Sequence, residues 1–159
     1  MDTLHGHAGH PAVTWSTAVT ATLHCLTGCA IGEILGMVIG TAFGLHNGTT
    51  VALSLALAFV FGYGLTVAGV RRAGVPWRSA VRLAVASDTV SIGVMELVDN
   101  AVILAVPGAM DAGLGSALFW GSLVFSLLVA FTVTLPVNRW LIGRGKGHAV
   151  VHQLHGQRG

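Results

Sequence analysis

Four long apolar segments divide this chain, and they limit its fold more than any other feature. Each segment contains the roughly 20 consecutive apolar residues that a membrane-spanning helix needs. Short connections rich in glycine, proline and asparagine separate them, which is the composition of turns. The segments cover residues 14–45, 50–70, 77–106 and 116–142. The sequence therefore predicts an all-α integral membrane bundle of four transmembrane helices.

Composition supports a membrane protein over a soluble one. Hydrophobic residues make up 53% of the 159 residues, charged residues only 9%, and the mean hydropathy is +0.78. A chain with so little polar material cannot cover the surface of a soluble domain of this length. We expect a lipid-embedded domain over residues 14–142, between a His-containing tail at 1–13 and a basic, His-containing tail at 143–159. Nothing in this composition suggests a nucleic-acid partner.

The eight Lys and Arg residues predict the orientation. Four of them flank the connection after the second segment, and the other four follow the fourth segment: Arg71, Arg72, Arg78, Arg82, then Arg139, Arg144, Lys146 and Arg158. In a four-span protein all eight lie on one side, which the positive-inside rule assigns to the cytoplasm. Both termini are then cytoplasmic. Residues 1–13 lack a basic n-region, so we expect no cleavable signal peptide.

A glycine series marks the first segment. Gly28, Gly32, Gly36, Gly40 and Gly44 recur every four residues and form one flat helical face. In lipid such a face lets a second helix approach closely. We expect the third segment to pack here, and a homodimer or another membrane protein docking on this face is the alternative.

Beside the glycine face runs a stripe of Cys25, Cys29, Glu33 and Met37. An ionisable side chain inside a membrane is costly and usually functional. The third segment also carries acidic residues, and helical rise places Asp88 level with Cys25 and Glu96 level with Glu33. Asp99 and Asn100 are expected nearer the outer interface. The predicted metal-binding track consists of His24, Cys25, Cys29, Glu33, Asp88 and Glu96.

Two other interpretations of this stripe remain open. Cysteine is a common small apolar residue of cores, so Cys25 and Cys29 are equally consistent with packing. Glu33 and Glu96 are also consistent with a carboxyl pair that shares one proton.

Histidines at both ends add a second indication of metal. The amino-terminal tail contains His5, His7 and His10, and the carboxy-terminal tail contains His148, His152 and His155. Thiolate and imidazole together favour Cu or Zn over Mg or Mn. The tails are equally well explained as polar, solvated segments.

Three sequence motifs resemble a known family. They are residues 22–33 (TLHCLTGCAIGE), Asp88-Thr89 followed by Glu96, and residues 136–142 (PVNRWLI) followed by Gly145-Lys146-Gly147-His148. Together they look like the bacterial membrane family called domain of unknown function 4396. After Glu96 this chain is poorer in methionine and aromatic residues than that pattern. The resemblance implies a multi-pass protein of the bacterial inner (cytoplasmic) membrane and no established activity.

Two functions follow from these observations. The first is a small membrane protein that binds or transports a transition-metal ion through the Cys/His/carboxylate track. The second is a non-catalytic subunit that docks another membrane protein through its glycine face. The sequence contains no nucleophile, phosphate-binding loop or cofactor motif, which disfavours an enzyme.

Overall fold

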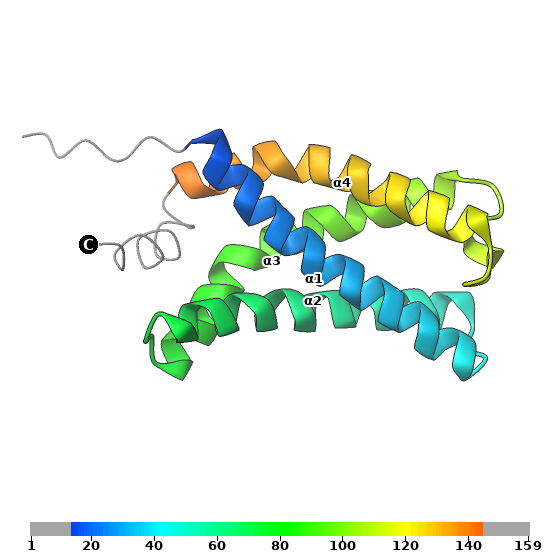
Figure 1. Cartoon of the computed structure of the whole chain (residues 1–159), viewed down its shortest axis with the longest axis horizontal. Helices are drawn as coiled ribbons and strands as arrows, with labels where there is room; N and C mark the ends of the chain where they lie inside the picture. Colours follow the sequence, from blue (N-terminus) through cyan, green and yellow to red (C-terminus); the bar gives the residue numbers. More distant parts are fainter. Residues whose placement is uncertain (1–13, 145–159) are drawn as a thin grey trace, which may run out of the picture.

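The structure, a computed structural model, describes residues 14–144 and consists of four helices and one short turn of 3₁₀ helix (Figure 1). The residues of both histidine-containing tails, 1–13 and 145–159, lie outside the described part of the chain. The elements are α1 (Trp15–Ala42), α2 (Asn47–Arg72), α3 (Trp77–Ala105), η1 (Ala109–Asp111) and α4 (Ala117–Gly143). The predicted all-α bundle of four helices is confirmed, with ends within a few residues of the predicted segments.

Local sequence explains where these helices begin and end. The Thr14 side chain caps α1 by accepting a hydrogen bond from the Thr17 amide at 3.2 Å, and Ser116 caps α4 through the Leu118 amide at 3.1 Å. After α2 the chain turns at Gly74, whose φ of +85° is open to glycine without strain. The α1–α2 and α2–α3 connections are consequently short, and the longer α3–α4 connection contains η1.

Three of the four helices, α1, α2 and α4, are long and apolar enough to cross a membrane. The exception, α3, is long enough at 29 residues but carries Arg78, Arg82, Asp88, Glu96 and Asp99. The structure therefore indicates a membrane protein with three candidate spans and one polar helix of similar length.

The glycine face of α1 packs against α2, so the prediction that it meets α3 is wrong. A Cβ atom added at Gly28 would lie 2.7 Å from the Gly62 Cα atom. The next contacts join Gly32 to Ala58, Gly36 to Ser54, and Gly40 to Thr50. Each step of four residues back along α1 thus matches a step of four forward along α2. Small residues on both helices allow this backbone approach.

The amino-terminal half of α1 meets α4 instead, because α1 crosses the bundle obliquely (Figure 1). The Asn138 side chain on α4 donates a hydrogen bond to Thr22 at 2.9 Å, and the Arg139 guanidinium lies 4.0 Å from the Trp15 ring centroid. This contact lies at the end of the bundle that also holds the α2–α3 connection with Arg71, Arg72 and Arg78, which we call the arginine end. The opposite end, which holds the α1–α2 connection and η1, is the loop end.

Candidate functional site

A cavity of about 390 Å³ opens at the arginine end. Among its lining residues are the predicted site residues His24, Cys25 and Asp88, contributed by α1 and α3. His24 Nε2 lies 3.1 Å from the Thr66 hydroxyl of α2, and Ser87 donates a 2.6 Å hydrogen bond to Asp88 Oδ1. The other Asp88 oxygen is buried without a hydrogen-bond partner. This arginine-end cavity is therefore polar at its inner wall.

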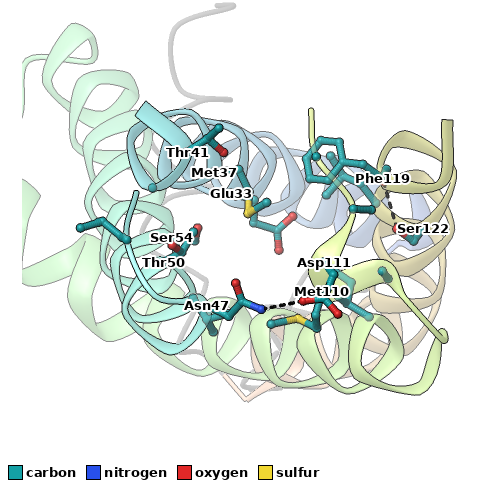
Figure 2. A pocket seen from close by; sticks show the side chains of 18 of the residues that line it. Glu33, Met37, Thr41, Asn47, Thr50, Ser54, Met110, Asp111, Phe119 and Ser122 are labelled. Carbon is teal, nitrogen blue, oxygen red and sulfur yellow. Dashed lines mark hydrogen bonds between the residues drawn. The ribbon is translucent and has the colours of Figure 1, made fainter. Parts of the chain in front are cut away.

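A second cavity, of about 310 Å³, opens at the loop end (Figure 2). Its lining includes Glu33 and Met37 from α1 and Met110 from η1, and Figure 2 shows the Glu33 carboxyl group pointing into it. At the rim, the Asn47 side chain donates a 3.1 Å hydrogen bond to Asp111. The two cavities share no lining residue.

Between the cavities lies a buried layer built mainly by α1 and α3. Cys25, Cys29 and Met95 pack there in one cluster with Ala58, Ile92 and Ala130. The Cys29 thiol faces the Glu96 carboxyl group, and the Glu33 carboxyl faces that of Asp99. Glu33, Glu96 and Asp99 are only 6%, 2% and 1% exposed. The layer thus holds three acidic side chains and two thiols, of which Glu33 and Cys25 also line a cavity and the other three line neither.

The carboxyl groups of this layer lack partners. Both oxygens of Glu96, both of Asp99 and one of Glu33 are buried without a hydrogen bond. The six arginines of the described segment, residues 14–144, are all exposed, so none neutralises them. Burying an uncompensated carboxylate costs several kcal/mol. A proton or a bound cation must therefore accompany these groups.

A separate polar network ties three helices together beside the arginine-end cavity. Asn138 of α4 accepts a hydrogen bond from Ser91 of α3 and donates one to Thr22 of α1. All three side chains are buried. Asn138 satisfies both neighbours through one amide and so forms a structural joint between α1, α3 and α4.

The six predicted metal-binding residues are placed in three groups rather than on one wall. His24, Cys25 and Asp88 lie at the arginine-end cavity, Glu33 lies at the loop-end cavity, and Cys29 and Glu96 lie between them. Within residues 14–144, no group of three or more His, Cys, Asp or Glu side chains is arranged to hold a metal ion. Cys25 and Asp88 are neighbours, as their depths predict. Glu33 faces Asp99 and also lies near its predicted partner Glu96, which is three residues before Asp99 on α3.

Asp99 is a residue of the buried layer that sequence reasoning left out of the site. It was expected near the outer interface, and the structure shows it buried inside the bundle near Glu33. Its position three residues after Glu96 puts both on one face of α3, a signal available in the sequence. Met95, which precedes Glu96 in the buried layer, was likewise not predicted as part of the site.

Comparison with known proteins places the chain in a family without assigning an activity. The family model described as Domain of unknown function (DUF4396) matches residues 14–147. The chain belongs to this family. No curated protein and no solved structure matches it. The match covers the whole helical bundle, so the cavities and the layer between them lie inside the family domain.

Proposed function

We propose that this protein binds a transition-metal ion, Cu or Zn, and carries it across the bacterial inner membrane. The observation that carries the proposal is the buried layer of unpartnered carboxyl groups and thiols between cavities at opposite ends of the bundle. A path that opens at both ends and has its ionisable groups in the middle is suited to moving a cation.

This function requires α3 to be the fourth span. Its acidic residues face the bundle interior, where α1, α2 and α4 shield them from lipid, so its low hydropathy does not prevent it from crossing. The exposed arginines at one end support a cytoplasmic arginine end, with both termini there. Trp15, Trp77 and Trp140 are exposed near the same end, as expected for an aromatic belt.

Metal would be held in steps along this path, since the described residues form no ready set of three ligands. His24, Cys25 and Asp88 provide one level, Cys29 and Glu96 the next, and Glu33 the third. Weak, successive sites favour release as well as entry, which transport needs.

The alternative function, docking of another protein through the glycine face, would have only Gly44 of this face free. Gly28, Gly32, Gly36 and Gly40 are covered by α2. A homodimer or a partner subunit would have to use another face.

Metal content tests the proposal. Protein purified without added ions should retain Cu or Zn, and a Cys25→Ser/Cys29→Ser variant should lose it while keeping its thermal unfolding midpoint. A Thr132→Ala variant serves as the control, because Thr132 is exposed on α4 and bonds only to its own helix at Leu128. Metal at background in all three proteins would reject the proposal.

A further inference from the structure

Every sulfur atom of the described residues lies in one of the two cavities or in the buried layer between them. Met37 and Met110 line the loop-end cavity, Met95 and Cys29 lie in the buried layer, and Cys25 joins that layer to the arginine-end cavity. None of the exposed large apolar side chains in residues 14–144 is a methionine. The sulfur atoms are therefore confined to the cavities and the buried layer, although a methionine side chain is apolar enough to face lipid.

The thioethers of the loop-end cavity project into its space. Figure 2 shows Met37 and Met110 reaching toward the cavity from α1 and η1, with the Glu33 carboxyl group between these walls. Glu33 is buried, and one of its oxygens has no partner. A thioether beside an unsatisfied carboxyl group gives this cavity a means of capturing a cation.

The chemical type and the number of these sulfur and carboxyl ligands indicate which ion they would bind. Thiol and thioether sulfur favour Cu(I) over harder ions. A tetrahedral Zn²⁺ site normally takes three or four His, Cys or carboxylate ligands, and residues 14–144 offer no such group. A monovalent soft ion is satisfied by two sulfur ligands.

Charge favours the same choice. The Born cost of moving an ion into a low-dielectric interior grows with the square of its charge. A divalent ion therefore costs about four times as much as a monovalent ion of equal size. In the buried layer, where Met95 and Ile92 are fully buried, this difference in desolvation cost favours a monovalent ion.

We propose that the transported ion is monovalent and soft, Cu(I) or its analogue Ag(I), and that it passes between sulfur ligands. The order is Met110 and Met37, then Met95 and Cys29, then Cys25, or the reverse. This inference rests on the proposed function and narrows its substrate from a transition metal to a monovalent sulfur-seeking ion.

Titration of the full-length purified protein with Ag⁺ and, separately, Zn²⁺ tests the inference. Wild type should bind Ag⁺ at least about tenfold more tightly than Zn²⁺. Met95→Leu keeps the side-chain volume but removes the thioether, and it should weaken Ag⁺ binding by about tenfold or more. The control, Leu97→Met, adds a thioether to a side chain that is 72% exposed, and it should leave Ag⁺ affinity unchanged.

The possible outcomes separate this inference from the proposed function. Preferential Zn²⁺ binding, or a folded Met95→Leu protein with wild-type Ag⁺ affinity, would overturn the sulfur route and leave metal binding intact. Absence of both ions from wild type would overturn the proposed function as well. If Met95→Leu does not fold, Met37→Leu/Met110→Leu in the loop-end cavity provides the same comparison of Ag⁺ affinity.

Discussion

Gly32→Ala should loosen the contact between α1 and α2 more than any other single methyl addition of its kind. The new Cβ atom would lie 2.5 Å from the Ala58 Cα and 2.7 Å from the Leu57 carbonyl carbon. Carbon atoms prefer separations of about 3.5–4.0 Å, so the two helices must move apart by about 1 Å. The obstacle is backbone and cannot rotate away. Overpacking of this kind typically costs about 1–3 kcal/mol.

The matched control is Gly64→Ala on α2, where an added Cβ would meet nothing within 4 Å. In water this change favours a helix by about 0.8–1.0 kcal/mol, so Gly64→Ala should be neutral or stabilising. Reversible unfolding in mixed micelles with increasing SDS measures both free energies of unfolding. Equal stability of the two variants would refute the close α1–α2 contact.

Two further predictions follow from the ends and the joint of the bundle. Single cysteines replacing Asn47 or Asp111, in a background whose native cysteines are alanine, should react with a membrane-impermeant thiol reagent only from outside the cell; labelling from the cytoplasm would reverse the orientation. Asn138→Leu should lower the free energy of unfolding by about 1–3 kcal/mol, because Ser91 and Thr22 lose their shared buried partner. Unchanged stability would show that this hydrogen-bond network does not stabilise the bundle.

The number and extent of the helices were predictable from sequence because glycine and proline residues mark where the helices begin and end. Helix α3 begins at Trp77 after Pro76 and ends before Pro107, as the segment 77–106 predicts. The polar content of α1 and α3 also predicted which helices build the interior. The length of an apolar segment and the residues of a turn are local properties, so a single sequence is enough to predict them.

The partner of the glycine face was mispredicted because only one helix was considered. A complementary series of small residues on α2, Thr50, Ser54, Ala58 and Gly62, repeats every four residues and matches α1 in antiparallel order. Consecutive helices joined by a short connection usually pack together. Both signals were present in the sequence.

The exact pairing of the acidic residues was not predictable in the same way. Helical rise alone placed Glu33 beside Glu96, but α1 crosses the bundle obliquely (Figure 1). The Glu33 carboxyl group consequently faces that of Asp99. The tilt results from the α1–α2 contact at one end and the Thr22–Asn138 contact at the other. Such long-range contacts determine which residues of α1 and α3 lie at the same depth, and counting residues along each helix cannot predict this.

Ion flux through the buried layer tests the central claim most directly. Full-length protein reconstituted in vesicles, with Cu(I) supplied outside under reducing conditions, should load the vesicle interior faster than protein-free vesicles do. Glu96→Gln removes the carboxyl group that faces Cys29 without changing its size, and this variant should abolish the flux while keeping the unfolding midpoint. Wild-type flux equal to that of protein-free vesicles, or full flux through a folded Glu96→Gln variant, would contradict the account.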